Sequence, residues 1–225
     1  MEKTQLKRHD LVFLSKEGKQ RIWQDISAGY CGAKKKLAEE VLIGATDVPG
    51  FVRRDDEHKG GLPLGFVHHK RLEGNRIRVG VSALEEDVMF ALSPYEVLER
   101  KIYAVEGKTA CLSTLARLYA LSEVFSLQVG VLGSAALELV TGLPYTDAAS
   151  DIDLLVKPAP YKQLLDFYKA AQVSFDGINM DFELDLPNGY GVKLAEMFMG
   201  TSTVLGKSLE DVALLSRSDV MRYLV

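Results

Sequence analysis

The stretch Val129–Lys157, VGVLGSAALELVTGLPYTDAASDIDLLVK, decides the fold that this sequence predicts. An apolar strand runs into Gly133-Ser134, a helix-like segment follows, and the chain returns as a second strand that carries two aspartates. Side chains two residues apart on a strand point to the same face, so we expect Asp151 and Asp153 to project together.

This pair of carboxylates predicts a metal site. Two like charges a few ångströms apart are costly to bring together unless a cation lies between them. Carboxylate and phosphate oxygens together favour Mg²⁺. Gly133-Ser134, at the turn into a helix, would offer backbone N–H groups to a phosphate. Solvated aspartates at a sheet edge are the alternative, but the apolar run Leu154–Val156 is typical of a buried strand, where Asp is rare. The pattern therefore predicts a nucleotidyltransferase active site.

A third carboxylate would complete a two-metal site. The segment Asn179–Leu186 alternates strictly, which predicts a strand with Asp181, Glu183 and Asp185 on one face. A solvated polar face is the alternative and would explain at least one of the three. Asp185 adjoins the predicted turn at residues 187–189, so the other two are favoured. The predicted catalytic residues are Asp151, Asp153, Glu183 and Asp181, and the predicted metal ligands are Asp151, Asp153 and Glu183.

Arginines in the first half of the chain are candidates for binding a triphosphate, because their forked donors match phosphate oxygens. We expect substrate contacts from Arg53, Arg54, Arg71 and Arg76. Local ion pairs, for example to the acids at residues 55–57, are an equally good interpretation on spacing alone.

The histidines are interpreted as structural residues or incidental phosphate contacts. His68 and His69 are adjacent on a predicted strand, so they should face opposite ways, and neither they nor His9 has a third ligand at suitable spacing. A Ser-His-Asp hydrolase is not supported, since the chain lacks the G-x-S-x-G nucleophile elbow, and a P-loop nucleotide site is not supported, since no G-x-x-x-x-G-K-[ST] motif occurs.

Composition agrees with a globular enzyme. The 225 residues are 47% apolar and 26% charged, without an apolar run that would suggest a membrane span or signal peptide. Cys31 and Cys111 show no metal-ligand spacing and suit free thiols in a cytoplasmic protein. The chain has no long basic tail of the kind that would suggest nucleic-acid binding. Residues 51–80 are rich in Lys and Arg, whereas acids predominate in residues 131–225.

The apolar periodicity predicts a small N-terminal α+β domain, residues 1–90, and a mixed-sheet domain flanked by helices, residues 91–225, which the Asp-x-Asp motif marks as nucleotidyltransferase-type. Strands are expected at 10–15, 51–54, 62–69, 76–83, 127–132 and 179–186, with a strand or a strand–helix junction at 192–198. Helices are expected at 17–44 (one or two, broken near Gly32), 94–103, 109–125 and 161–171, with a terminal helix beginning at 209–215.

The motifs resemble those of the phosphoribosyl-dephospho-CoA transferases, the holo-acyl-carrier-protein synthases of malonate decarboxylase. The resemblance spans most of the chain, and the residues that carry it are Gly133-Ser134, Thr141–Tyr145, Ser150–Leu155, Arg53-Arg54, Leu62–Gly65, Asp181-x-Glu183-Leu184, Pro187-x-Gly189 and Glu196. The chain departs from the family pattern at Ala135–Glu138, where Trp and Gln are common, and at His68-His69, where Arg is common.

The resemblance implies a donor, 2′-(5″-triphosphoribosyl)-3′-dephospho-CoA, and an acceptor serine on the acyl carrier protein subunit of malonate decarboxylase. Asp151 and Asp153 match the family's catalytic aspartates. Acyl carriers are typically acidic, so the resemblance also implies that the basic segment at 51–80 is a docking surface and that the N-terminal domain, residues 1–90, contacts substrate and carrier. Two other functions stay open at this point: an ATP-dependent nucleotidyltransferase acting on another hydroxyl, and a catalytically silent binding module.

Overall fold

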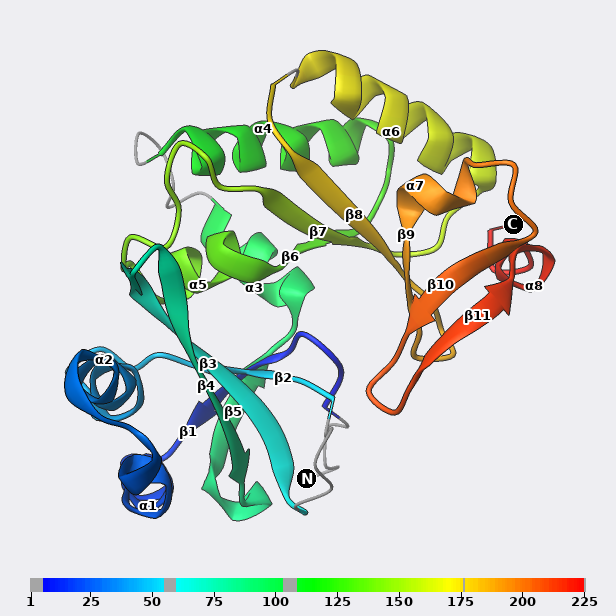
Figure 1. Ribbon diagram of the computed structural model, residues 1–225. Helices are drawn as coiled ribbons and strands as arrows, with labels where there is room; N and C mark the ends of the chain where they lie inside the picture. Colours follow the sequence, from blue (N-terminus) through cyan, green and yellow to red (C-terminus); the bar gives the residue numbers. More distant parts are fainter. Residues whose placement is uncertain (1–5, 55–59, 103–108, 176, 225) are drawn as a thin grey trace. The chain divides into compact units, whose positions relative to one another are not determined.

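The computed structural model describes residues 6–54, 60–102, 109–175 and 177–224, which form two compact units (Figure 1). The first unit comprises Met1–Ser93 and Thr141–Tyr145, and the second comprises Pro94–Val140 and Thr146–Val225. Each unit holds one sheet, antiparallel in the first and mixed in the second, so the prediction of a mixed α and β protein is confirmed. Among the helices described, none has the length and apolar character needed to cross a membrane.

The first unit is built on a five-stranded sheet in the order β4-β3-β2-β1-β5. Burial alternates along β4, as expected for a strand with one face on the core. Two helices join β1 to β2, and the second begins at Gly32, where the sequence predicted a break. The elements are β1 (Leu11–Leu14), α1 (Lys16–Ile26), η1 (Ser27–Gly29), α2 (Gly32–Ile43), β2 (Gly50–Val52), β3 (Leu62–Leu72), β4 (Asn75–Ala83), η2 (Glu85–Asp87) and β5 (Val88–Leu92).

The segment Thr141–Tyr145 belongs to the first unit although its neighbours in sequence belong to the second. Tyr145 is fully buried, and its hydroxyl donates a hydrogen bond to the Val67 carbonyl of β3 at 2.7 Å. The Arg76 guanidinium of β4 donates to the Tyr145 carbonyl and lies 5.6 Å from the centre of the tyrosine ring. Burial raises the pKa of the Tyr145 hydroxyl to about 12, so this donor keeps its proton across the neutral range.

The second unit is built on a six-stranded sheet in the order β11-β10-β9-β8-β7-β6. Of its strand pairs, β7 and β8 run parallel and the others described are antiparallel. The elements are α3 (Pro94–Lys101), α4 (Ala110–Val124), β6 (Val129–Val131), α5 (Gly133–Thr141), β7 (Ile152–Val156), α6 (Tyr161–Ser174), β8 (Met180–Asp185), β9 (Gly191–Lys193), α7 (Leu194–Met197), β10 (Thr203–Lys207), β11 (Val212–Ser216) and α8 (Arg217–Met221).

The two faces of this sheet carry different helices. Figure 1 shows α4 and α6 along one face, where the Phe167 ring of α6 lies 5.5 Å from the Phe182 ring of β8. Helix α3 lies against the other face, because Gly130 of β6 has no side chain and leaves room for Pro94. The residues of β7 and β8 that alternate with the apolar core positions therefore point to the face of α3.

The position of one predicted element is wrong, and two strands were missed. The segment at 209–215 was expected to begin a terminal helix, but residues 212–216 pair in full with β10 as β11, and the terminal helix, α8, begins only at Arg217. Strands β5 and β10 were not predicted. The expected helix at 94–103 ends at Lys101 in the described part of the chain, and Tyr103 lies outside that part. The expected strand–helix junction at 192–198 is present as β9 and α7.

We predict that Tyr145→Phe lowers the free energy of unfolding by about 1–3 kcal/mol, because it removes the partner of a buried carbonyl. Urea denaturation of the full chain measures this change. Tyr190→Phe is the matched control, since the Tyr190 hydroxyl bonds to Asp211 at the surface and its loss should change stability little. Equal effects of the two substitutions would contradict the prediction.

Candidate active site

The turn from β6 into α5 brings Gly133 directly against Asp153. Gly133 has φ of 62°, and a Cβ atom built on it would collide with the Asp153 carboxylate. The backbone locks the same approach, because the Leu132 N–H donates to the Asp153 carbonyl at 2.9 Å. Gly133 itself is exposed, and the start of a helix such as α5 carries a partial positive charge that favours an anion.

The two aspartates of the Asp-x-Asp motif differ in burial. Asp153 lies within β7 and is half-buried, whereas Asp151 precedes the strand and is exposed. The apolar residues that follow them are buried, which confirms the predicted buried strand. Asp153 is therefore held by β7 next to the β6–α5 turn, whereas Asp151 is exposed to solvent just before the strand.

The parallel register of β7 and β8 decides which acid of β8 lies beside the motif. Asp153 is paired with Asp181, whereas Glu183 is paired with Leu155, two residues further along each strand. The alternation of both strands places Asp153, Asp181 and Glu183 on the same face. The register thus favours Asp181 as the third carboxylate, and the assignment of Glu183 as a metal ligand stays a prediction.

Lysines and a tyrosine contact the acids of β8. Lys193 of β9 donates to the Asp181 carboxylate at 2.8 Å, and this hydrogen bond raises the pKa of Lys193. Asp185 accepts from Lys157 at 2.5 Å and from the Tyr95 hydroxyl of α3 at 2.9 Å. Asp185 therefore ties α3 to the sheet, in keeping with its lower rank among the predicted acids.

The donor set tests whether Mg²⁺ fits. Within the described ranges, no three His, Cys, Asp or Glu side chains are grouped so as to hold a metal ion. Mg²⁺ is commonly held by one or two carboxylates together with substrate phosphates and water, so a complete protein cage is not required. Asp151 and Asp153, beside an anion-accepting helix start, fit that arrangement, with Asp181 next in register.

A buried polar cluster supports the loop that carries Asp151, and sequence reasoning missed it. The Glu138 carboxylate of α5 is 5% exposed and accepts from the Thr146 N–H at 2.5 Å. The Thr146 and Thr109 hydroxyls are 2.8 Å apart. The Cys111 thiol contacts the Asp151 carbonyl at 3.9 Å, and burial together with the charge of Glu138 raises its pKa to about 11. A lone acid in the apolar run AALELV was the available signal.

The predicted phosphate-binding arginines all lie in the first unit, whereas the carboxylates lie in the second. Arg53 bonds the Arg54 carbonyl at 3.3 Å, and its guanidinium lies close to Gly80 of β4. Arg71 donates to the Gly74 carbonyl in the β3–β4 turn, and Arg76 holds Tyr145 as described above. Substrate contacts from these arginines stay predictions, and the acids at 55–57 lie outside the described residues.

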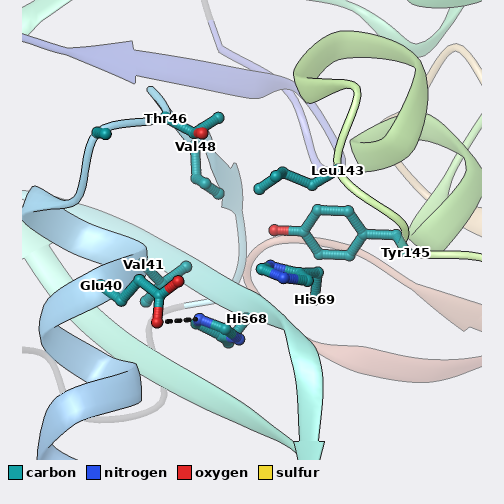
Figure 2. A pocket seen from close by; sticks show the side chains of 9 residues that line it. Glu40, Val41, Thr46, Val48, His68, His69, Leu143 and Tyr145 are labelled. Atoms are coloured by element: carbon teal, nitrogen blue, oxygen red, sulfur yellow. Dashed lines mark ion pairs between the residues drawn. The ribbon is translucent and has the colours of Figure 1, made fainter.

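The prediction that His68 and His69 face opposite ways is wrong. The pairing of β3 with β4 shifts register between Val67 and Arg71, and such an irregularity turns side chains out of strict alternation. The two imidazole rings stack with centroids 4.5 Å apart. Both rings line a cavity of about 100 Å³ within the first unit, which Figure 2 shows from close by. Its other lining residues are Glu40, Val41, Ala45, Thr46, Val48, Leu143 and Tyr145.

Hydrogen bonding fixes the tautomer of the buried His68. Its Nδ1 accepts from the Lys70 N–H at 3.0 Å, so its hydrogen is on Nε2, which lies 3.4 Å from the Glu40 carboxylate. Desolvation lowers the pKa of His69, and the positive charge of Lys70 lowers it further. The surroundings of His69 in the stacked pair therefore disfavour its charged form.

We predict that Gly133→Ala destabilises the chain by about 1–3 kcal/mol more than Gly189→Ala. Both glycines have positive φ, but the space around Gly189 is open, so that substitution tests backbone strain alone. Urea denaturation measures both. In an Asp153→Ala background the excess cost at Gly133 should disappear, and its persistence would show that the contact with Asp153 is not its cause.

We also predict that His69 makes stability depend on pH. Because the unfolded imidazole, with a pKa near 6.5, binds a proton more readily than the folded one, this contribution is complete above that pH. It is lost as the pH falls through the lowered pKa of the folded state. Chemical denaturation from pH 7 to pH 5 should show a shallower decline for His69→Gln than for the wild-type chain, and parallel curves would contradict the assignment.

Comparisons with known proteins agree with the motifs. Residues 98–218, which include the contact of Gly133 with Asp153, match the family described as the phosphoribosyl-dephospho-CoA transferase MdcG C-terminal domain. A phosphoribosyl-dephospho-CoA transferase of Bradyrhizobium diazoefficiens is 30% identical over 220 residues, which cover 93% of this chain and 90% of the relative. One from Xanthomonas euvesicatoria is 29% identical over 216 residues, 94% of each chain.

No solved structure matches the chain. The family match covers more than half of the sequence, and the relatives align over nearly the whole length of both proteins. The chain therefore belongs to the phosphoribosyl-dephospho-CoA transferase family and is a transferase enzyme.

Proposed function

We propose that the enzyme transfers the 2′-(5″-phosphoribosyl)-3′-dephospho-CoA group from its triphosphoribosyl precursor to a serine of the malonate decarboxylase acyl carrier protein. The observation that carries the proposal is the contact of the Asp153 carboxylate with Gly133, at the open start of α5, within the part of the chain that matches the family. A phosphate-binding helix start and a carboxylate occupy one small site there, as a nucleotidyltransferase-type domain requires.

The transfer exchanges a phosphoanhydride bond for a phosphate ester bond. The serine oxygen forms a bond to the innermost phosphorus of the triphosphate, and the bond from that phosphorus to pyrophosphate breaks. The serine proton passes to a carboxylate and then to solvent, and pyrophosphate leaves. Such a reaction needs positioning and neutralisation of charge rather than a covalent enzyme intermediate.

The chain's own residues meet these needs in separate ways. The N–H groups at Gly133 and Ser134 bind the outer phosphates, which suits the exposed start of α5. Asp181 is aligned with Asp153 on the same face and serves as the acceptor of the serine proton, with Glu183 two residues further along the strand as the alternative. The bond from Lys193 orients the Asp181 carboxylate.

The proposal includes Mg²⁺ held by Asp151, Asp153 and the donor's phosphates. A phosphate at the start of α5 would lie beside the Asp153 carboxylate, and two negative groups so close require a cation between them. When bound, the ion supplies charge neutralisation for the departing pyrophosphate.

We predict that Asp151→Asn and Asp153→Asn each lower the rate of carrier modification by at least about 100-fold without unfolding the chain. Transfer is measured as the mass increase of apo-carrier, with pyrophosphate release as a second readout. Asp166→Asn on α6 is the control, because Asp166 pairs only with Lys162 at the surface among the contacts described there, and full activity is expected.

The choice of donor separates the proposal from its rival. Transfer from the triphosphoribosyl donor, with ATP inactive, is the expected result. Release of pyrophosphate from ATP alone, with no carrier modification, would identify an ATP-dependent nucleotidyltransferase acting on another hydroxyl and would overturn the proposal. Full activity of both aspartate variants would show that the site is wrongly assigned.

A further inference from the structure

The face of the second sheet that carries the candidate carboxylates continues onto the β10–β11 hairpin. Glu183 of β8 is paired with Lys193 of β9, and Gly206 of β10 is paired with Val192, which sets Leu205 beside Lys193. Leu205 is in turn paired with Leu214 of β11. Because residues paired across a sheet share a face, one row runs from the acids of β8 to the outermost strand.

This row ends in an exposed apolar strip, which we define as Leu205, Val212 and Leu214. Their exposed fractions are 37%, 46% and 73%. The opposite side of the same hairpin is covered, since Val204 and Gly206 are buried. Figure 1 shows the hairpin, in orange and red, at the edge of the second sheet. The exposure is therefore confined to the face that carries the candidate active site.

The strip lacks the features that normally protect an exposed edge strand. A strand at the edge of a sheet is normally protected from association by charged side chains, proline or a bulge. β11 has the sequence VALLS, without charge or proline, and pairs with β10 in regular register. Exposed apolar groups of this kind mark interaction surfaces when they are contiguous.

The charges on this face indicate the chemistry of the partner. Lys193 and Lys207 lie on the same face as the strip, on β9 and β10, and Lys193, which bonds Asp181, lies between the strip and the acids of β8. The acid nearest the strip in the hairpin turn, Asp211, is engaged by Ser208 and Tyr190. Apolar contact flanked by lysines suits an acidic protein that presents a small apolar patch.

We propose that the strip is a docking surface for the acidic carrier protein and contacts the carrier next to its acceptor serine. This inference rests on the proposed function, which requires a protein acceptor at the carboxylates. Neighbouring strands are about 4.8 Å apart, so the strip lies about 10–14 Å from β8. A small protein that rests on the strip thus spans the distance that its serine needs to reach Asp153 and Asp181.

The test compares Leu214→Asp with Val173→Asp in the full chain. Val173 is 82% exposed on α6, which covers the opposite face, so both variants add one negative charge at an exposed apolar position. For Leu214→Asp we expect the KM for apo-carrier to rise about 10-fold or more, with kcat nearly unchanged. Calorimetry of carrier binding in the absence of the nucleotide donor should show a matching loss of affinity. Val173→Asp should match the wild type, and Leu214→Ser should fall between them.

The outcomes are distinct. If the wild-type chain transfers the group but Leu214→Asp keeps its KM and carrier affinity, the docking proposal is overturned while the proposed function stands. A wild-type dimer that Leu214→Asp dissociates without changing the KM would identify the strip as an interface between copies and would also overturn it. If the wild-type chain modifies no carrier, the proposed function fails first, and the docking proposal fails with it.

Discussion

The close approach of the Asp153 carboxylate to Gly133 is the constraint on which the candidate site depends. It requires a residue without a side chain at the start of α5, a positive φ there, and a β6–β7 pairing that sets the depth of β7. Each requirement is met by a different level of structure, from residue type to strand register. The result is that a helix start suited to phosphate and a carboxylate suited to a cation face the same small volume.

The parallel pairing of β7 with β8 divides the labour among the acids of β8. Asp181 falls beside the motif, whereas Asp185 falls where α3 needs an anchor and accepts from Tyr95 and Lys157. Burial, followed by the charge of Asp185, raises the pKa of the Tyr95 hydroxyl, so this bond persists at any physiological pH. One end of β8 thus carries a candidate catalytic acid, and the other end stabilises the packing of α3. A shift of one residue in the pairing of β7 with β8 would exchange the buried and exposed faces of β8.

The sequence predicted what depends on local pattern. The succession β6–α5–β7 followed from apolar runs around a Gly-Ser turn, and β8 from strict alternation. What depends on pairing was not accessible in this way: the choice between Asp181 and Glu183 needs the register, and the strand at residues 212–216 needs β10 as a partner against a helix-like spacing. The stacking of His68 on His69 likewise needs the irregularity in β3, which no residue type announces.

The assignment of Thr141–Tyr145 to the first unit has a consequence for any attempt to divide the chain. The region that defines the family, residues 98–218, contains a short piece whose most buried ring lies in the core of the other unit. A gene fragment that encoded the carboxylate-bearing half alone would carry Tyr145 without Val67 and Arg76, and would expose a large aromatic surface. The family-matching region therefore needs the first unit to bury Tyr145, and the relatives align over nearly the whole length of both proteins.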